Sequence, residues 1–439
     1  MGQLFSKGQT IRSPSGIEYK VEEFLGGGGQ GEVYKVSSLG KQWALKWTLS
    51  SIAPEEQEEH KRSIESLISK GSPTEKFLWP LALVTSDDTQ GFGYIMPLRP
   101  HNYYELTEWL QQKIHPNFFS LSTAGFNLAD NFFYLHINGL AYMDISLGNV
   151  FLDPRTGDVL ICDNDNVTIN KSKTKIQGTM RFKAPEVVRR EAMPSTDTDR
   201  FSLAVLLFYM LFLHHPLEGK KSEEIPVDLS YDMLVFGKDP IFIFDPNNKT
   251  NTPDPRYQKN PLEIWPIYPQ FIKDLFTRTF TDGLKDTQNG RVTEAEWKSA
   301  FLKLRDSIIH CPKCRAETFY DIETLKKTGN PLPKCWHCKS DIPLPPRIEI
   351  GNLIVMLTRN TKLFQYHIEP LSYDIKTMIA EISIHPKNPN IWGLKNMSDR
   401  PWLITKADNS KIELPPGKNF PLSNGSVINF GKVQGKIIF

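Results

Sequence analysis

The stretch YMDISLGNVFLD, Tyr142–Asp153, decides how the fold of this 439-residue chain is interpreted. It places Asp144 five residues before Asn149, and the following ICDNDN places Asp163 nineteen residues after Asp144. One aspartate in a loop would be unremarkable, but these separations from an asparagine and a second aspartate match a family motif that is identified below. Asp144 is therefore our first candidate for a chemically active residue.

A glycine-rich stretch precedes this region. FLGGGGQGEVYKV, Phe24–Val36, sets four consecutive glycines between two segments that alternate like β-strands. Gly26, Gly28 and Gly31 form G-x-G-x-x-G, but a strand follows where a Rossmann turn would have a helix. A P-loop is excluded because no Gly-Lys-Ser/Thr occurs. A glycine-rich hairpin followed by WALK, which ends at Lys46, is typical of a lid over nucleotide phosphates; a plain glycine-rich hairpin is the alternative.

The motifs after the Asp144 stretch complete an ordered series. GTMRFKAPE spans Gly178–Glu186, the apolar run DRFSLAVLLF begins at Asp199, and GRVTEAEW contains Arg291. Together with the glycine-rich hairpin, these motifs have the order and spacing of the eukaryotic-type protein kinases. From about residue 11 to residue 309 the chain therefore resembles that family, and in particular its bacterial Ser/Thr kinases.

The resemblance implies an α+β fold with two lobes, a protein kinase-like domain over residues 1–309. The N-lobe is expected at about 11–98 and the C-lobe at about 99–309. Helix-like apolar runs at Phe118–Asn138 and Thr198–Leu213 agree with a helix-rich second lobe.

Two structural contacts also follow from the resemblance. The helix that begins near Asp199 is expected to anchor the loop that carries Asp144. Arg291 is expected to pair with Glu186, the glutamate of the Ala-Pro-Glu motif.

The resemblance implies catalytic roles as well, because phosphoryl transfer needs positioning and charge neutralisation more than covalent chemistry. Asp144 would accept or orient the proton of the substrate hydroxyl. Asn149 and Asp163 would hold Mg²⁺ or Mn²⁺, hard cations that prefer oxygen ligands.

Lys46 would contact the α- and β-phosphates of ATP. Such a lysine needs an acidic partner on the following helix, for which we expect Glu65 in SIESLI, with Glu59 as the alternative. The other expected nucleotide contacts are the lid, the pocket walls and the hinge: Gly26, Gly27, Gly28, Gly29, Gly31, Val33, Ala44, Met96, Pro97 and Arg99.

Three departures from the family pattern bear on activity. Met143 replaces an arginine that normally binds a phosphate on the activation loop, so we expect activity without activation-loop phosphorylation. Ser146 replaces a lysine that neutralises the γ-phosphate, and Lys173 and Lys183 are the alternatives for its substitute. Asp165 replaces a glycine that takes positive φ, and we expect its carboxylate to join the metal site.

Four of the five cysteines form two knuckles. Cys311 and Cys314 make one C-x₂-C, and Cys335 and Cys338 make another after twenty residues. Zn²⁺ binds four thiolates in a tetrahedron, and this spacing is typical of such sites; a pair of disulfides is the alternative. We expect residues 310–342 to form a zinc ribbon whose closed Cys₄ site is structural.

The remainder of the chain, residues 345–439, has strand-like runs separated by turn signals, which predict an all-β module. WLITKADNSKIELPPGKNFPLSNGSVINFG resembles the last strands of a forkhead-associated β-sandwich, a module that binds phosphothreonine. The upstream Gly-Arg and Ser-x-x-His of that family have no convincing counterparts here. We therefore expect a forkhead-associated-like sandwich that docks a partner, and leave phosphopeptide binding open.

Composition excludes several classes of protein. The chain has 52 Lys+Arg against 50 Asp+Glu, a balance that argues against nucleic acid and membrane surfaces as partners. The longest apolar run, Leu203–Leu213, is too short to span a bilayer. Four of the five cysteines pair by spacing as metal knuckles, which suits an intracellular reducing compartment. We expect a cytoplasmic kinase that phosphorylates Ser/Thr of proteins, itself included; the alternative is a pseudokinase scaffold that binds ATP and docks partners.

Overall fold

The structure is a computed structural model. It describes these residues of the chain: 3–28, 31–48, 54–171, 178–228, 230–321, 327 and 334–439. Two compact units are present, the first made of Met1–Trp265 and Lys273–Ser299, the second of Pro266–Ile272 and Ala300–Phe439. Two of the expected candidates, Gly29 and Lys173, lie outside the described residues.

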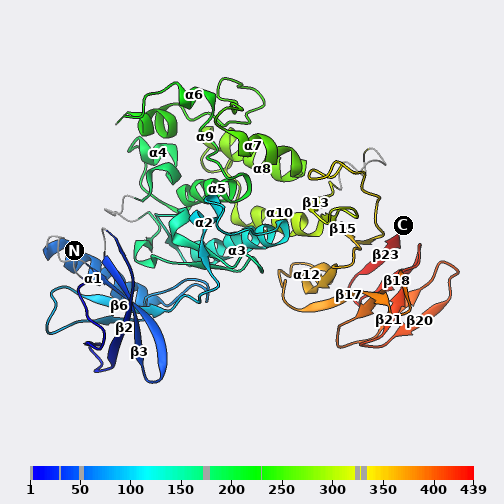
Figure 1. Ribbon diagram of the computed structural model, residues 1–439, viewed down its shortest axis with the longest axis horizontal. Helices are drawn as coiled ribbons and strands as arrows, with labels where there is room; N and C mark the ends of the chain where they lie inside the picture. Colours follow the sequence, from blue (N-terminus) through cyan, green and yellow to red (C-terminus); the bar gives the residue numbers. More distant parts are fainter. Residues whose placement is uncertain are drawn as a thin grey trace. The chain divides into compact units, whose positions relative to one another are not determined.

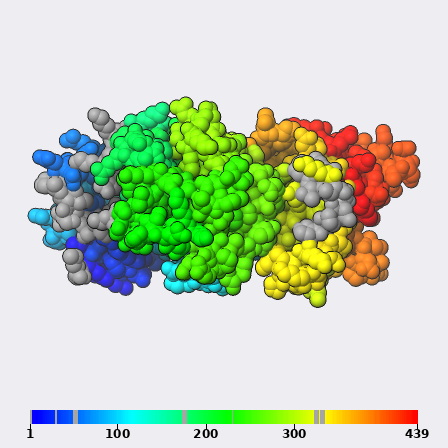
Figure 2. Space-filling view, turned by 90° about the horizontal axis from the view of Figure 1, so that it is seen from above, coloured from blue at the N-terminus to red at the C-terminus, as the bar shows by residue number. Residues whose placement is uncertain are grey.

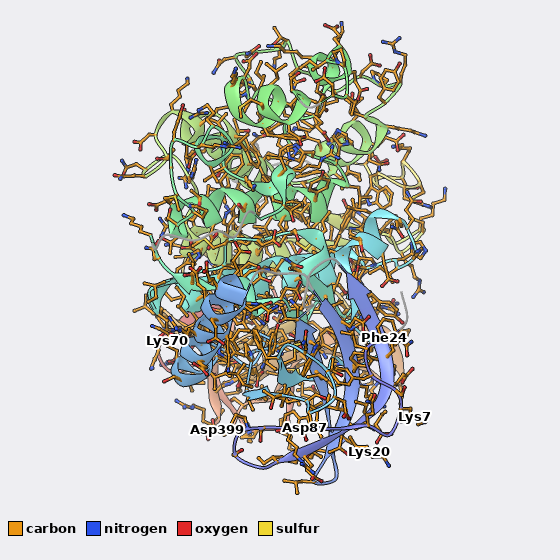
Figure 3. The ribbon with its side chains drawn as sticks, turned by 90° about the vertical axis from the view of Figure 1, so that its left-hand side faces the viewer. Lys7, Lys20, Phe24, Lys70, Asp87 and Asp399 are labelled. Atoms are coloured by element: carbon orange, nitrogen blue, oxygen red, sulfur yellow. The ribbon has the colours of Figure 1, made fainter. Side chains whose placement is uncertain are left out.

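The first unit begins with a six-stranded antiparallel sheet of order β1-β2-β3-β4-β6-β5 (Figure 1). Alternate side chains point to opposite faces of a strand, so Tyr34, Val36 and Leu45 are buried together on one face. Figure 3 labels Lys20 and Phe24 along β2. The strands are β1 (Thr10–Arg12), β2 (Glu18–Gly28), β3 (Gly31–Ser38), β4 (Lys41–Thr48), β5 (Ala82–Val84) and β6 (Gly93–Pro97).

Helix α1 (Pro54–Lys70) packs on the other face of this sheet. Its Ile64 and Leu67, which share one side of a helix, are buried, and Ile64 contacts the cluster that contains Ala44. Acidic residues in the first turn and Lys70 in the last, labelled in Figure 3, complement the helix dipole. The expected helix at this position is confirmed.

The helical part of the first unit is built around α5 (Thr196–Phe212), which is buried on nearly every side because its sequence is apolar all round. Helix α3 (Phe118–Ile137) packs beside it. The segment from α6 to α7, green in Figure 2, lies on the surface of that view. The other helices are α2 (Leu106–Leu110), α4 (Pro185–Val188), α6 (Lys220–Glu223), α7 (Lys259–Ile264), α8 (Gln270–Phe280), α9 (Asp282–Lys285) and α10 (Glu294–Asp306).

Short strands hold the loops of the candidate site. They pair as the sheets β10-β9-β7 and β11-β8. Their bounds are β7 (Tyr104–Glu105), β8 (Leu140–Ala141), β9 (Val150–Leu152), β10 (Val159–Ile161) and β11 (Thr168–Ile169). Among the helices that the structure describes, none is long and apolar enough to cross a bilayer.

The second unit contains a small hairpin and a two-sheet sandwich, which confirms the expected all-β module. The hairpin is β12 (Ile308–His310) and β13 (Glu317–Phe319). The sheets have the orders β15-β14-β23-β22-β19-β20 and β16-β17-β18-β21, and Trp402 and Phe430 lie in the core between them. The strands are β14 (Arg347–Ile350), β15 (Leu353–Met356), β16 (Lys362–Phe364), β17 (Met378–His385), β18 (Asn388–Asn396), β19 (Trp402–Thr405), β20 (Lys411–Leu414), β21 (Asn419–Pro421), β22 (Val427–Asn429) and β23 (Gln434–Ile438), with the short helix α12 (Gln365–Ile368).

The cysteine segment and the sandwich share one core. Ile309 and Tyr320 of the cysteine segment pack with Ile354 and Met356 of β15, and the yellow, orange and red atoms adjoin in Figure 2. At the end of α10, Asp306 accepts hydrogen bonds from Tyr366 Oη (2.5 Å) and His367 Nε2 (3.1 Å). The expected boundaries at residues 309, 342 and 345, and the forkhead-associated identity of the sandwich, stay predictions.

Candidate functional site

Strand register places the glycine-rich hairpin beside Lys46. Val33 of β3 lies opposite Lys46 of β4, and Ala44 lies opposite Met96 of β6. Because side chains alternate along β4, Ala44 and Lys46 point to the face opposite that of Leu45. Val33 therefore lies beside Lys46, and Ala44, with its neighbour Met96, lies two residues earlier along β4.

The glycines of the hairpin serve two different purposes. A Cβ on Gly31 would lie 2.3 Å from the carbonyl oxygen of Trp47, so glycine is needed for β3 to approach β4. A Cβ on Gly26 or Gly28 would meet no atom of the described residues within 4 Å. Packing within the described chain therefore does not require glycine at these two positions, and the bare backbone leaves room for a ligand to approach closely.

An apolar cluster that joins the six-stranded sheet to β9 and β10 lies next to Lys46. Val33, Ala44 and Met96 belong to it, together with Phe151 of β9 and Leu160 of β10. We did not predict the last two as site residues. The signal for them was present in the short apolar runs VFL and VLI that flank a turn, but only the fold brings these runs under β4.

The expected hinge follows β6 directly. Pro97 is the last residue of that strand. The guanidinium carbon of Arg99 lies 4.3 Å from the ring centroid of Phe151, and its Nη1 donates to the carbonyl oxygen of Tyr103 (2.5 Å). Arg99 is thus held against one wall of the apolar cluster.

Lys46 forms an ion-pair cluster with two aspartates, the buried Asp165 and the partly exposed Asp163. Its Nζ lies 3.0 Å from both carboxylate oxygens of Asp165 and 3.3 Å from Oδ1 of Asp163. Helix α1 contributes His60, whose Nε2 lies 3.5 Å from Oδ2 of Asp165. We call these four residues the Lys46 cluster.

The expected partner of Lys46 is corrected by this arrangement. Glu65 and the alternative Glu59 are exposed on α1, and the ion pairs of Lys46 with described residues are those with Asp163 and Asp165. The reason is the phase of the helix: Ile64 fills its inward side, and the next residue along an α-helix points about 100° away.

Charge in the Lys46 cluster is unevenly compensated. Burial would lower the pKa of Lys46, but the charges of Asp165 and Asp163 outweigh burial and raise it. Burial would raise the pKa of Asp165, but Lys46 and His60 outweigh burial and lower it. For Asp163, burial prevails over the attraction of Lys46 and, with repulsion from Asp165, raises the pKa. One ammonium faces two carboxylates, and Asp163 is the less stabilised.

The Asp144 loop is held by short hydrogen bonds. Asn149 Nδ2 donates to the Asp144 carbonyl oxygen (2.8 Å) and lies 3.1 Å from Asp144 Oδ2. The backbone N–H and Oγ1 of Thr179 donate to Asp144 Oδ1 at 2.7 and 2.8 Å. The Cys162 N–H donates to the Asn149 carbonyl oxygen (3.0 Å). These bonds bring Asp144 and Asn149 together and connect them with the residue before Asp163.

Two residues of this region have left-handed backbone conformations. Met143 has φ 67° and Asp163 has φ 51°, conformations that cost energy in non-glycine residues and cluster at functional sites. Asp165 instead lies in the 3₁₀ turn η2 (Asn164–Asn166), so the expected need for positive φ falls on Asp163. Gly178 has φ 58°, and a Cβ there would lie 2.5 Å from the Met143 carbonyl oxygen.

Asp199 of α5 anchors the loop that contains Asp144. Its Oδ2 accepts the backbone N–H of Tyr142 (2.6 Å), and its Oδ1 accepts that of Met143 (3.3 Å). The side-chain hydroxyl of Tyr142 donates to the carbonyl oxygen of Cys162. The expected anchoring role of this helix is confirmed.

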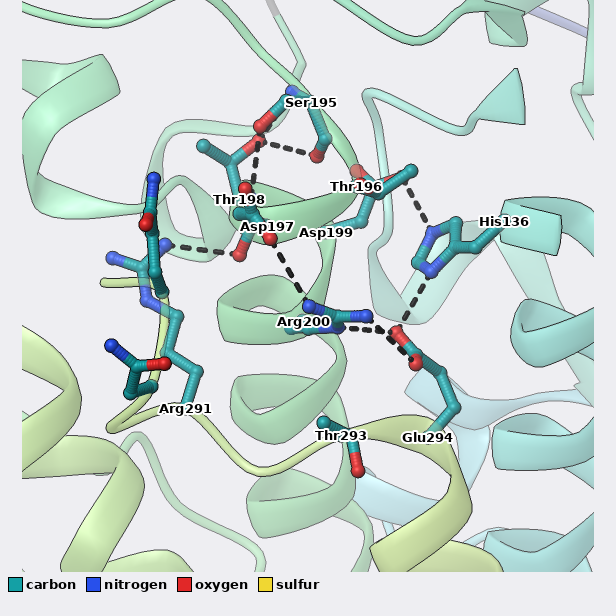
Figure 4. Close-up of polar contacts among 12 residues, drawn as sticks. His136, Ser195, Thr196, Asp197, Thr198, Asp199, Arg200, Arg291, Thr293 and Glu294 are labelled. Atoms are coloured by element: carbon teal, nitrogen blue, oxygen red, sulfur yellow. Dashed lines mark hydrogen bonds and ion pairs between the residues drawn. The ribbon is translucent and has the colours of Figure 1, made fainter. Parts of the chain in front are cut away.

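Asp199 belongs to a scaffold network made of His136, Asp199, Arg200 and Glu294 (Figure 4). His136 lies 3.2 Å from Asp199 through Nε2 and 2.8 Å from Glu294 through Nδ1. Arg200 Nε lies 2.9 Å from Glu294. Burial would lower the pKa of His136, but hydrogen bonds to the two carboxylates raise it to about 9. His136 and Arg200 likewise lower the pKa of Glu294 to about 2 against the effect of burial.

The expected pairing of Arg291 with Glu186 is confirmed. Nη1 and Nη2 of Arg291 lie 2.8 and 2.9 Å from the two oxygens of Glu186. Arg291 Nη1 also donates to the Asp197 carbonyl oxygen (3.0 Å), drawn in Figure 4. Its side chain is fully buried, and its contacts with Glu186 and Asp197 together connect α4 with the start of α5.

Residues 19–282, more than half of the chain, match the family model described as Protein kinase domain. The chain belongs to the protein kinase family. Similar proteins include serine/threonine-protein kinase plk-2 of Caenorhabditis elegans, 31% identical over 106 residues, with 23% of this chain and 16% of that protein covered. Protein kinase C-like 2 of Schizosaccharomyces pombe is 33% identical over 96 residues, 21% of this chain and 9% of that protein.

Beta-adrenergic receptor kinase 1 of Didelphis virginiana is 28% identical over 222 residues, 47% of this chain and 30% of that protein. The chain thus spans less than a third of the length of each of these three relatives.

The kinase site has groups that fit ATP and a divalent cation. Asp163 and Asn149 supply oxygens, the ligands that Mg²⁺ and Mn²⁺ prefer. The excess of carboxylate over ammonium around Asp163 is the charge imbalance that a cation would relieve. Lys46 supplies a positive charge for phosphates, and the open backbone at Gly26 and Gly28 supplies space above it.

The four cysteines predicted to bind zinc converge. Their sulfur atoms all lie within 4.8 Å of one another, and the pairs Cys311–Cys338 and Cys314–Cys335 are each 3.6 Å apart. A disulfide would need about 2.05 Å, whereas a tetrahedral Zn²⁺ with bonds of about 2.3 Å separates its sulfurs by about 3.8 Å. The geometry fits zinc.

Proposed function

We propose that this protein is an ATP-dependent protein kinase that transfers the γ-phosphate to Ser or Thr hydroxyls of proteins, including its own. The observation that carries the proposal is the convergence of Lys46, Asp163 and the Asp144–Asn149 pair from three segments of the chain. Lys46 and Asp163 lie 3.3 Å apart, and Asn149 lies 3.1 Å from Asp144. The two pairs are connected by the N–H of Cys162, the residue before Asp163, which donates to the Asn149 carbonyl oxygen (3.0 Å). Membership of the kinase family supports the reaction class.

The residues divide the work of phosphoryl transfer. When bound, ATP with Mg²⁺ or Mn²⁺ supplies an activated phosphoryl group whose charge is partly neutralised. Lys46 would hold the α- and β-phosphates, and Asp163 and Asn149 would hold the metal ion. Asp144 accepts or orients the proton of the substrate hydroxyl, with Thr179 fixing its carboxylate.

The alternative is an ATP-binding scaffold with little chemistry. Its specific support is the close pairing of Lys46 with Asp165 and the absence of a lysine between Asp144 and Asn149 in the sequence. We propose Lys183 as the substitute for that lysine. Lys183 is half-buried, and burial lowers its pKa. The negative charge of Asp144 is close enough to oppose this effect in part.

Label transfer from γ-labelled ATP separates the two functions. Wild type, Asp144→Ala and the exposed control Asp87→Ala are incubated with Mg²⁺ or Mn²⁺, and labelled residues are identified by mass spectrometry. We expect phosphoserine or phosphothreonine with wild type and the control, and a loss of about 100-fold or more with Asp144→Ala, because positioned proton transfer contributes 10²–10⁴-fold. Equal labelling by Asp144→Ala with an unchanged melting temperature would contradict the proposal.

Activity independent of activation-loop phosphorylation is part of the proposal. Its support is Met143, a buried apolar side chain where a phosphate-binding arginine is expected. The triple substitution Thr168→Ala, Ser172→Ala and Thr174→Ala should leave the turnover rate within about twofold of wild type; Ser172 and Thr174 lie outside the described residues. A fall of about 100-fold, the size typical of losing an essential catalytic group, would refute it.

We further propose that the four cysteines bind one structural Zn²⁺ and that the sandwich docks a protein partner. Metal analysis should find about one zinc per chain in wild type and none in Cys311→Ser/Cys335→Ser, with a lower melting temperature because structural zinc contributes folding energy. Protein purified without chelator that lacks zinc would contradict the zinc proposal.

A phosphothreonine-peptide library tests whether the docking partner of the sandwich is phosphorylated. If no peptide is enriched, the sandwich is a docking module of another specificity.

A further inference from the structure

The lysine proposed to hold ATP has its closest carboxylate on an unexpected segment. The sequence pattern places that carboxylate on α1, yet both oxygens of Asp165 lie 3.0 Å from Lys46 Nζ. Asp165 belongs to η2, two residues after Asp163. Asp163 is the more distant of the two aspartates, at 3.3 Å.

The groups around Asp165 stabilise its ion pair with Lys46. Asp165 is 7% and Lys46 is 6% exposed, so water competes little for either charge. Four groups face the Asp165 carboxylate: Lys46 from β4, His60 from α1, Asp163 from its own loop and Tyr94 from β6. Burial keeps Tyr94 neutral by raising its pKa, and Lys46 is the nearest cation.

We propose that Asp165 is the positioning residue of Lys46, taking the role expected of a glutamate on α1, and that His60 is the contact through which α1 reaches the pair. This inference rests on the proposed function, in which Lys46 holds the phosphates of ATP. It assigns Asp165 to the lysine and leaves the metal to Asp163 and Asn149.

One consequence concerns how the site is assembled. Asp165, the partner of Lys46, and the metal ligand Asp163 both belong to the segment 163–165. This segment would therefore position the lysine and the metal ion, the two cations that would contact the triphosphate. Helix α1 contacts Asp165 through the imidazole of His60, 3.5 Å away, and its Glu65 is exposed. The position of α1 therefore has less control over Lys46 than a helix glutamate would give it.

The pairing is tested without nucleotide by a double-mutant cycle. Melting temperatures are measured for Lys46→Met, Asp165→Asn and the double variant, because each single change leaves a buried partner uncompensated and contacting pairs are non-additive. We expect the summed single shifts to exceed that of the double variant by about 2 °C or more. The same cycle with Glu65→Gln should be additive. Additivity in the Asp165 cycle, or coupling of equal size in the Glu65 cycle, would overturn the inference.

The role is tested by moving the carboxylate back to α1. Asp165→Asn should lower kcat/KM for phosphate transfer at saturating Mg²⁺ by about tenfold or more, a typical effect of misplacing one positioned group. Asp165→Asn/His60→Glu should recover several-fold, since position 60 already lies within reach of the pair. Glu58→Gln, exposed on the same helix, is the matched control for folding and rate. Failure of the double variant to exceed Asp165→Asn, while it still folds, would overturn the role.

The concentration of Mg²⁺ needed for half-maximal rate distinguishes a lysine partner from a metal ligand. It should be unchanged within about twofold in Asp165→Asn and raised about tenfold or more in Asp163→Asn. A raised requirement in Asp165→Asn, with the rate restored by excess Mg²⁺, would assign Asp165 to the metal and overturn the inference. If wild type transfers no phosphate, the proposed function fails, whereas the nucleotide-free cycle still decides the pairing.

Discussion

The kinase domain contains two largely buried networks that are similar in chemistry but differ in how well their charges are compensated. In the scaffold network, His136 and Arg200 compensate Glu294, and Asp199 accepts two backbone N–H groups besides His136. In the Lys46 cluster, one ammonium faces two carboxylates.

The pKa directions express this difference. In the scaffold network the pKa of His136 is raised to about 9 and that of Glu294 lowered to about 2, so both charged forms are favoured. In the Lys46 cluster the pKa of Asp163 is raised, which means that its charge is only partly satisfied. A network whose charges are all paired stabilises the fold, whereas functional sites tend to contain charged groups that are only partly paired.

Removing the uncompensated carboxylate should have the largest effect and should act on activity alone. Asp163→Asn is expected to lower kcat/KM by about 10⁴-fold, about 5 kcal/mol of activation free energy, because the metal loses a ligand. The melting temperature should be unchanged or higher, because a repulsive partner of Asp165 is removed. Rate and melting temperature are measured in parallel. A clear loss of stability would contradict the claim that Asp163 serves activity and not folding.

Removing a carboxylate from the scaffold network should act on folding. Asp199→Ala leaves His136 and the N–H groups of Tyr142 and Met143 without their buried acceptor. We expect the free energy of unfolding to fall by about 3–5 kcal/mol, the usual result of breaking a buried pair. Urea unfolding measures it, and a change below about 1 kcal/mol, the size of an exposed pair, would mean that the network is not compensated as described.

The charge on His136 should make stability depend on pH. Its folded pKa of about 9 exceeds the ordinary 6.5, so its contribution is complete below about pH 6.5 and is lost as pH rises through about 9. The shift corresponds to about 3 kcal/mol. The difference in unfolding free energy between wild type and His136→Gln should therefore be larger at pH 6 than at pH 9.5 by about this amount. A difference independent of pH would show that His136 is neutral in the fold.

The parts that the sequence predicts well are those set by a periodic pattern or an ordered series of motifs. The strands around Lys46, the buried helix α5 and the Arg291–Glu186 pair belong to this class. Asp144 and Asn149 were brought together as expected because they occupy one short loop.

Other features depend on three-dimensional proximity that no spacing encodes. Asp165 reaches Lys46 only because η2 turns beneath β4, while the phase of α1 sends Glu65 outward. Phe151 and Leu160 meet Val33, Ala44 and Met96 only after β9 and β10 pack against the six-stranded sheet. The shared core of the cysteine segment and the sandwich likewise joins residues that lie far apart in the chain.

Charge-conserving exchanges test the distinction between the catalytic cluster and the structural contacts most directly. Lys46→Arg keeps a positive charge but moves it, and Arg291→Lys keeps a charge but loses the two-point contact with Glu186. Phosphate transfer per folded molecule and urea unfolding are measured for both. We predict that Lys46→Arg transfers below about 1% of the wild-type rate, a cost of about 3 kcal/mol in the barrier, with a near wild-type midpoint, and that Arg291→Lys loses stability but not intrinsic rate. Wild-type transfer by Lys46→Arg would contradict the assignment of the site.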